Sequence, residues 1–100
     1  MSRWARKVDT NHGLVRDGLR DRGWAVADTH RVGGGFGDLV VSGPSPCPKC
    51  GYMLARTAVC EVKSPNGKPN LEQTTFAVDW PGLYVVAYDL QDVEMVFENE

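Results

Sequence analysis

Two short runs organise the chain, Phe36-Gly37-Asp38-Leu39-Val40-Val41 and Val59-Cys60-Glu61-Val62-Lys63. Each has the composition of a half-buried strand, yet each carries charge where an apolar residue is usual. Because side chains alternate along a strand, Glu61 and Lys63 fall on one face and Val62 on the other. Burying such charges is costly unless they are paired or bind a cation. The two runs therefore predict a charged site built on two adjacent strands.

The remainder of the chain predicts one small domain, residues 1–100, with an insertion at about residues 43–56. Hydrophobic residues make up 42% of the chain and charged residues 24%, as in ordinary soluble proteins. No apolar run could span a membrane, and the basic start lacks the apolar stretch of a secretory signal. The odd number of cysteines, three, fits a reducing compartment better than a disulfide scaffold. We therefore expect a cytoplasmic protein with no membrane partner.

The net charge of −2 argues against a strongly basic nucleic-acid-binding protein, but the charge is unevenly distributed. Residues 1–50 hold eight Lys and Arg against five Asp and Glu, whereas residues 51–100 hold three against eight. The basic side consists of Arg3, Arg6, Lys7, Arg16, Arg20, Arg22 and Arg31. A basic face on an acidic protein can still meet a polyanion. The alternative is an ordinary solvated helix.

Periodicity, capping and turn signals predict the element order α-β-β-β-α-β-α. Helices are expected at about residues 11–22, at residues 71–80 and after residue 89; strands are expected at about residues 24–28, 38–42, 57–63 and 83–87. The second and third strands form a hairpin, and the third and fourth are joined by a parallel crossover. The fourth strand is mostly apolar, which predicts a central, covered position. The fold class is α/β (α+β), a four-stranded mixed sheet flanked by helices.

Asp38 begins its strand, whereas Glu61 and Lys63 end theirs, so the hairpin brings all three to its open end beside a Gly-rich loop. Two neighbouring carboxylates repel unless a cation lies between them. Mg²⁺ prefers oxygen ligands, and the backbone carbonyl of Val62 is a further candidate ligand. Lys63 could hold a phosphate, act on a water or stabilise developing charge. Hydrolysis of a phosphodiester suits this group; the alternative is a Glu–Lys pair on an exposed edge strand.

The order of these motifs resembles the PD-(D/E)XK nuclease superfamily, and within it the small phage-type nucleases of the VRR-NUC and Holliday-junction-resolvase-like group. The residues that carry the resemblance are Val8-Asp9-Thr10-Asn11, residues 32–41, Glu61-Val62-Lys63, Gln73, Phe76 and Trp80. It implies a restriction-endonuclease-like core. It also implies a Mg²⁺- or Mn²⁺-dependent DNA endonuclease, structure-selective for branched DNA, in phage replication, recombination or repair.

By this resemblance Asp38 and Glu61 are metal ligands, Lys63 is the catalytic lysine, and Gln73 faces the site. The residues expected to contact DNA are Arg6, Lys7, Arg16, Arg31, Gly34 and Gly35. Two features depart from the family: Gly37 stands where relatives have proline, and the first helix lacks the Glu that completes the metal shell. Asn11 and Asp9 are the candidates to replace that Glu.

A second candidate site is Cys47-Pro48-Lys49-Cys50-Gly51, a zinc-knuckle sequence in the insertion. Zinc prefers four ligands, and this motif offers two thiolates. Cys60 is expected to be a buried core thiol, His12 and His30 belong to the opposite end of the hairpin, and His30 is expected to be an exposed loop residue. Three interpretations stay open: a zinc site completed by another chain, a reduced thiol pair, or a disulfide.

The alternative to a nuclease is a function of a different class: a non-catalytic nucleic-acid- or protein-binding module on a nuclease scaffold. It is motivated by the missing helix-one Glu, and the cysteine motif would be its contact surface. A homodimer is a further expectation, because the final helix is mostly apolar and the sheet has an exposed edge.

Overall fold

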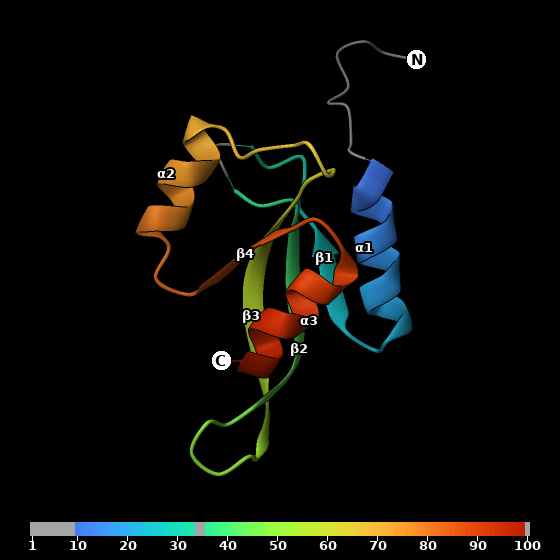
Figure 1. Ribbon diagram of the computed structural model, residues 1–100, viewed down its shortest axis with the longest axis vertical. Coiled ribbons are helices and arrows are strands. Elements are labelled where there is room, and N and C mark those ends of the chain that lie inside the picture. The colour runs from blue at the N-terminus through green and yellow to red at the C-terminus, as the bar shows by residue number, and fades with distance from the viewer. Residues whose placement is uncertain (1–9, 34–35, 100) are drawn as a thin grey trace.

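The computed structural model describes residues 10–33 and 36–99, and its elements follow the predicted order (Figure 1). The elements are α1 (Thr10–Asp21), β1 (Ala25–Asp28), β2 (Leu39–Pro46), β3 (Met53–Val62), α2 (Leu71–Asp79), β4 (Leu83–Ala87) and α3 (Leu90–Asn99). The strands form one mixed sheet in the spatial order β1-β2-β3-β4. β1, β2 and β3 are antiparallel neighbours, and β4 lies parallel to β3. The α+β architecture and the parallel crossover through α2 are therefore confirmed.

One prediction about the sheet is wrong, because β4 is an edge strand rather than a central one. Within the described residues, its neighbour is β3 alone. Val85 and Ala87 are nevertheless buried, since they belong to the core that α3 covers. The apolar composition of β4 thus reflects cover on its face rather than strands on both sides.

The β2–β3 hairpin is longer than predicted. Its pairing runs from Leu39 opposite Cys60 to Pro46 opposite Met53, so only residues 47–52 form the tip. The strand was expected to end at residue 42, before Pro44 and Pro46. Alternation instead turns their nitrogen atoms away from β3, beyond the end of β1, where a missing N–H costs no ladder bond. The part of the predicted insertion that flanks the tip is therefore a regular two-stranded ribbon.

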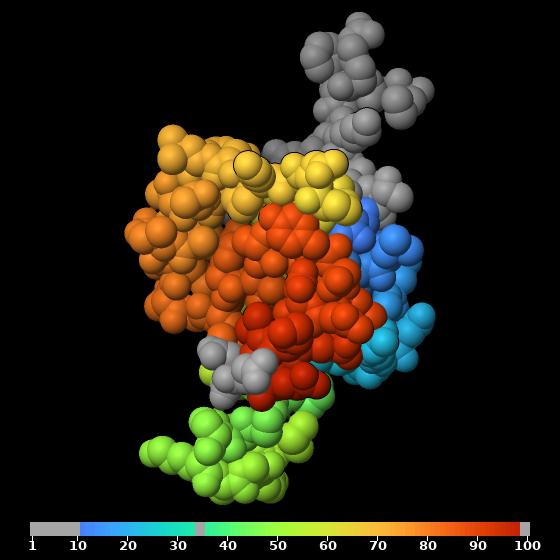
Figure 2. Space-filling model, viewed as in Figure 1, coloured from blue at the N-terminus to red at the C-terminus, as the bar shows by residue number. Residues whose placement is uncertain are grey.

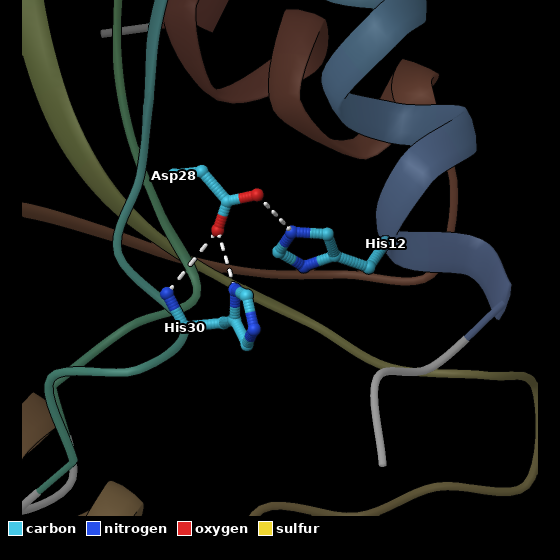
Figure 3. A group of neighbouring side chains, drawn as sticks. All are labelled: His12, Asp28 and His30. Carbon is cyan, nitrogen blue, oxygen red and sulfur yellow. Dashed lines mark hydrogen bonds and ion pairs between the residues drawn. The ribbon is translucent and has the colours of Figure 1, made fainter. Parts of the chain in front are cut away.

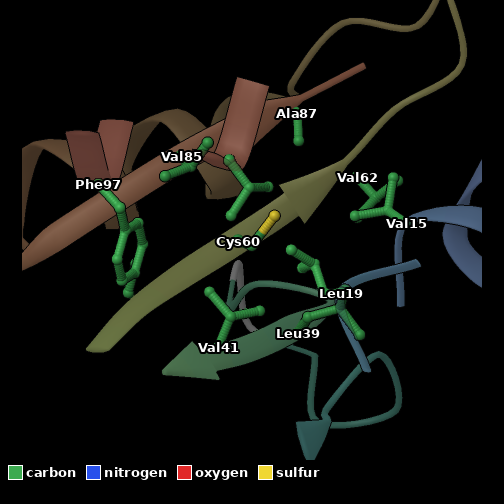
Figure 4. Packing of buried hydrophobic residues seen from close by; sticks show 11 residues of the cluster. Val15, Leu19, Leu39, Val41, Cys60, Val62, Val85, Ala87 and Phe97 are labelled. Atoms are coloured by element: carbon green, nitrogen blue, oxygen red, sulfur yellow. The ribbon is translucent and has the colours of Figure 1, made fainter. Parts of the chain in front are cut away.

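The hydrophobic core lies between the sheet and the helices α1 and α3 (Figure 4). It consists of Val15, Leu19, Leu39, Val41, Ala58, Cys60, Val62, Val85, Ala87, Val93 and Phe97. Leu39, Cys60 and Val85 face one another across three strands and form its central row. Trp24 packs edge-on against Phe97 with ring centroids 4.6 Å apart. Cys60 is thus the buried core thiol predicted from its sequence position.

Helix α2 lies on the opposite side of the sheet, where Gln73 contacts Glu61, and it buries none of its own residues. An aromatic cluster holds this helix: Phe76 has its ring centroid 5.4 Å from that of Phe36, 5.3 Å from that of Trp80 and 5.9 Å from that of Tyr84. Tyr84 stands opposite Val59 on the sheet, next to the Glu61–Val86 pair. The cluster therefore places α2 over the face that carries Glu61.

A capping box begins α2 and fixes the direction of one polar side chain. The Asn70 side chain accepts a hydrogen bond from the backbone N–H of Gln73, and the Gln73 side chain accepts one from the backbone N–H of Asn70. Both bonds measure 2.9 Å. This arrangement leaves the amide nitrogen of Gln73 pointing out of the box, toward the sheet.

We call residues 43–56 the hairpin arm. In the space-filling view the arm projects from the body as a separate lobe (Figure 2). Residues 49–55 are all exposed, including the apolar side chains of Tyr52, Met53 and Leu54. Across the described residues, no helix is both long and apolar enough to cross a membrane.

Candidate active site

The structure brings Asp38, Glu61 and Lys63 together at the open end of the hairpin. Asp38 immediately precedes β2, and its Oδ2 atom accepts a hydrogen bond of 2.9 Å from the backbone N–H of Val62. Leu39 and Cys60 form the last backbone pair of the ladder. The Asp38 carboxylate therefore replaces the strand carbonyl that Val62 would otherwise meet. This bond ties the carboxylate to the end of β3 and orients it toward Glu61.

Glu61 is the most deeply buried charged residue of this group, with 2% of its surface exposed. Its Oε2 atom accepts a hydrogen bond of 2.6 Å from Nε2 of Gln73 and lies 3.3 Å from Nζ of Lys63. Its Oε1 atom is buried and has no hydrogen-bond partner among the described residues. A buried carboxylate oxygen without a partner is costly, so this atom marks a place where a further group is expected to bind.

The environment of Glu61 disfavours its charged form. Burial raises the pKa of Glu61 to about 7, and the negative charge of the neighbouring Asp38 carboxyl group acts in the same direction. The positive charge of Lys63 lowers the pKa of Glu61, but this effect is smaller than the combined effect of burial and Asp38. The two acids therefore share a site in which the charge of Lys63 does not offset both carboxyl groups, which is an electrostatic condition that favours cation binding.

Tyr84 adds a second unsatisfied atom on this face of the sheet. Its hydroxyl group is buried and has no hydrogen-bond partner among the described residues. Burial, followed by the charges of Glu61 and Asp38, raises the pKa of Tyr84 to about 12. Ordered water is the usual partner of such a buried hydroxyl group.

Gly37 stands where the resemblance predicts proline, and the packing explains why a glycine is needed. The residue is buried against β3. A Cβ atom added to it would lie 2.5 Å from Cγ1 of Val59 and 2.8 Å from the backbone oxygen of Cys60. This position has no room for a side chain, so the close contact of the loop with β3 sets the position of Asp38.

Asn11 and Asp9 were the candidates to complete the metal shell from the first helix. The Asn11 amide nitrogen donates to the backbone carbonyls of Lys63, at 2.9 Å, and Tyr88. Asn11 thus joins the start of α1 to the chain after β3 and β4. Asp9 lies outside the described residues. The Val62 carbonyl points to the same side of β3 as its N–H, the side on which Asp38 lies, as alternation in a strand requires.

Two of the four described cations of the predicted basic face, Arg16 and Arg22, pair with acidic side chains of the chain. Arg16 contacts Asp17 at 2.9 Å and Asp28 at 3.2 Å. Nε of Arg22 lies 3.1 Å from Oε2 of Glu94, and both side chains of this ion pair are partly exposed. Of the other predicted DNA contacts, Arg31 is exposed, whereas Arg6, Lys7, Gly34 and Gly35 lie outside the described residues. The described part of the chain therefore offers less basic surface for a polyanion than the sequence suggests.

A second polar group lies at the same end of the sheet, on the α1 face, and the sequence motifs did not predict it (Figure 3). We call His12, Asp28 and His30 the histidine cluster. Nε2 of His12 lies 3.0 Å from one Asp28 oxygen, and Nδ1 of His30 lies 2.7 Å from the other. Their candidate ligand atoms all lie within 4.8 Å of one another, so the cluster could hold a metal ion.

The histidine cluster also has a structural role, because it joins α1 to β1 and the following loop. Burial alone would raise the pKa of Asp28, but hydrogen bonds from His30, His12 and Arg16 hold it well below its ordinary value. A metal ion would compete with Arg16 for this carboxylate. The expectation that His30 is exposed is wrong, since only 18% of its side chain is accessible.

A signal for part of this cluster is present in the sequence. His12, Val15 and Leu19 are spaced three and four residues apart, so they share one face of α1. Val15 and Leu19 are core residues, and this face therefore carries His12 inward, where it is 2% exposed. The contact with Asp28 depends on how α1 packs against β1, which periodicity does not reveal.

The three cysteines divide between the two ends of the hairpin. Cys60 is buried in the core, and burial raises the pKa of its thiol. Cys47 and Cys50 lie at the tip of the arm, and all three cysteines are free thiols. His12 and His30 contact Asp28 beside the start of β2, so the prediction that they lie away from the tip is confirmed.

The chain was compared with known proteins at three levels. It matches no protein-family model, no curated protein and no solved structure.

Proposed function

We propose that the chain is a metal-dependent endonuclease that hydrolyses phosphodiester bonds in DNA. The observation that carries the proposal is the unsatisfied, buried Oε1 atom of Glu61 beside the Asp38 carboxylate. A carboxylate pair held in this way favours a bound cation over two bare negative charges. The order of the motifs, which resembles the PD-(D/E)XK superfamily, supports the same activity.

The residues present fit Mg²⁺ or Mn²⁺. Glu61 offers its free oxygen, Asp38 offers its carboxylate, and the Val62 carbonyl lies on the same side of β3. All three are hard oxygen donors, which Mg²⁺ prefers while it keeps several waters. When bound, such an ion polarises a phosphoryl oxygen and generates a nucleophile from water at neutral pH.

The chain's own side chains hold this geometry. Gln73 donates to Oε2 of Glu61 and so leaves Oε1 as the free ligand atom. Nζ of Lys63 lies 3.3 Å from the same Oε2 atom, and a fifth of the Lys63 side chain is exposed. Its ammonium group can therefore reach an approaching phosphate and stabilise the negative charge that develops there. The Val62 N–H orients Asp38.

The substrate class follows from this chemistry and from the resemblance. A cation between two carboxylates, with a lysine at the rim, suits the negative, oxygen-rich backbone of a nucleic acid. The resemblance favours DNA, and branched DNA in replication, recombination or repair. Arg31 is an exposed cation among the described residues that could contact the DNA backbone.

The test is DNA cleavage by the purified chain with Mg²⁺, Mn²⁺ or EDTA, on plasmid, duplex and four-way-junction substrates. We expect cleavage only with the divalent ions. Glu61→Gln keeps the size of the side chain but removes a ligand charge, and should lower the rate at least about 100-fold. Glu98→Gln, on the exposed surface of α3, is the matched control and should cleave like the wild type.

Two outcomes would contradict the proposal. Cleavage that persists in EDTA would exclude the metal, and equal rates for the wild type and Glu61→Gln would exclude the carboxylate site. Tight DNA binding without cleavage would instead support the non-catalytic module. One observation favours that second function: Asn11, the helix-one candidate, donates to two backbone carbonyls and brings no carboxylate to the site.

A further inference from the structure

The tip of the hairpin arm carries a motif that the proposed function does not use. Cys47 and Cys50 are accessible, free thiols at the end of a two-stranded ribbon. The tip is separated from the carboxylate site by the length of β3, roughly 26 Å at about 3.3 Å per residue. Any role of these thiols is therefore separate from the chemistry at Glu61.

The backbone of the tip has the form of a metal-binding knuckle. The Cys47 carbonyl accepts a hydrogen bond of 2.8 Å from the N–H of Gly51, and the Cys47 N–H donates one of 2.8 Å to the carbonyl of Tyr52. Gly51 has φ of +75°, which a residue with a side chain rarely adopts. These bonds close a tight loop that carries both cysteines.

Hydrogen bonds to sulfur prepare Cys47 for metal binding. The backbone N–H groups of Lys49 and Cys50, and the Cys50 thiol, form hydrogen bonds to the sulfur of Cys47. The last of these bonds shows that the two sulfur atoms lie within reach of each other.

One chain cannot complete a zinc site at this tip. Structural zinc sites have four protein ligands, usually thiolates and imidazoles. The chain has three cysteines and two histidines, of which Cys60 is in the core while His12 and His30 contact Asp28 at the other end. Residues 43–56 contain no Asp or Glu. The two missing ligands must therefore come from another molecule.

We propose that Cys47 and Cys50 form half of a zinc site that a second copy of this chain completes, so that one Zn²⁺ joins two hairpin arms tip to tip. Four thiolates and one Zn²⁺ have a net charge of −2, which the Lys49 side chains of the two copies would balance. Beside the knuckle, Tyr52, Met53 and Leu54 are exposed apolar side chains that such a contact would cover. A second copy supplies both the ligands and the apolar surface.

The experiment measures zinc content and molecular mass together, on the full chain in a reducing buffer. We expect 0.5 Zn²⁺ per chain, as two copies share one ion, and a mass that doubles from 11.0 kDa when zinc is added. EDTA should restore the monomer. Co²⁺ in place of zinc should give the absorption bands of a tetrahedral thiolate site.

Single substitutions at the tip test the ligands. Cys47→Ser and Cys50→Ser should each lower bound zinc at least tenfold and leave a monomer, while circular dichroism shows an intact fold. Cys60→Ala removes the one thiol that the proposal does not use, and should bind zinc and dimerise like the wild type. One Zn²⁺ per monomer, a dimer that forms without zinc, or no zinc binding would each overturn the proposal. None of these outcomes affects the nuclease assay in Mg²⁺.

Discussion

Glu61 is the residue whose chemistry depends most on its surroundings. An exposed glutamate has a pKa near 4.5, and the buried site raises the pKa of Glu61 to about 7. Between these values the folded chain binds a proton that the unfolded chain has lost. Folding stability without metal should therefore fall as pH rises from about 5 to 8.

Unfolding by urea in EDTA at pH 5 and pH 8 measures this effect. We expect the ionisation of Glu61 to lower the free energy of unfolding of the wild type by on the order of 2 kcal/mol between pH 5 and pH 8. Glu61→Gln cannot ionise and should show a flatter dependence, whereas Glu98→Gln should follow the wild type. Adding Mg²⁺ at pH 8 should recover the lost stability, because the ion binds the ionised folded state. Identical slopes for the wild type and Glu61→Gln would contradict the electrostatic account of this site.

Strand alternation explains why the carboxylate site could be predicted residue by residue. Asp38, Glu61 and Lys63 lie on one hairpin, so register and period decide their meeting. The histidine cluster escaped prediction because its members come from α1, the end of β1 and a loop. Their meeting depends on the packing of separate elements. The close packing of Gly37 against β3 could not be predicted for the same reason, because a glycine in the sequence does not show how near another strand lies.

At the scale of elements, the loop before β2 is held against β3 at Gly37. Gly37→Ala would force a Cβ atom to within 2.5 Å of Val59 and 2.8 Å of a backbone oxygen. We expect it to lower the free energy of unfolding by roughly 1–3 kcal/mol, because backbone and side chain must both shift. It should also displace Asp38 and reduce any Mg²⁺-dependent cleavage.

Gly13→Ala is the control for this prediction. Gly13 lies in α1, and an added Cβ there meets nothing nearer than 3.7 Å. Alanine favours a helix, so this change should raise the free energy of unfolding by about 0.5–1 kcal/mol. Chemical unfolding of both variants provides the comparison. A Gly37→Ala variant as stable as the wild type would show that the loop is not packed against β3 as described.

Element order was predictable from capping and turn residues, whereas element length and position were less so. Asp89 accepts a hydrogen bond from the N–H of Asp92 and begins α3 as expected. The Pro-rich stretch after residue 42 was expected to be irregular, but β2 continues through Pro44 and Pro46, which lie on an edge where no N–H is needed. The apolar β4 suggested a central strand, yet α3 supplies the cover. In both cases the residue types indicate only the local environment of the strand, and more than one topology can provide that environment.

At the scale of the whole molecule, the body and the tip of the arm are expected to be energetically independent. The backbone groups of Ser45 and Leu54 turn toward each other across the hairpin, so an Asn-Gly turn can replace residues 46–53. We expect this shortened chain to change the free energy of unfolding in EDTA by no more than about 1 kcal/mol. It should cleave DNA as the wild type does and no longer dimerise with zinc. Loss of folding on shortening would show instead that the tip supports the core.

The hydrogen bond from the Val62 N–H to Asp38 has a consequence for spectroscopy. A backbone amide proton senses the charge of the group that it contacts, and here that group is a proposed metal ligand. In isotope-labelled protein, the resonance of this one amide would report directly on whether Asp38 is free, protonated or bound to an ion. The chain thus contains an internal probe of its own site, readable without substrate, dye or mutation.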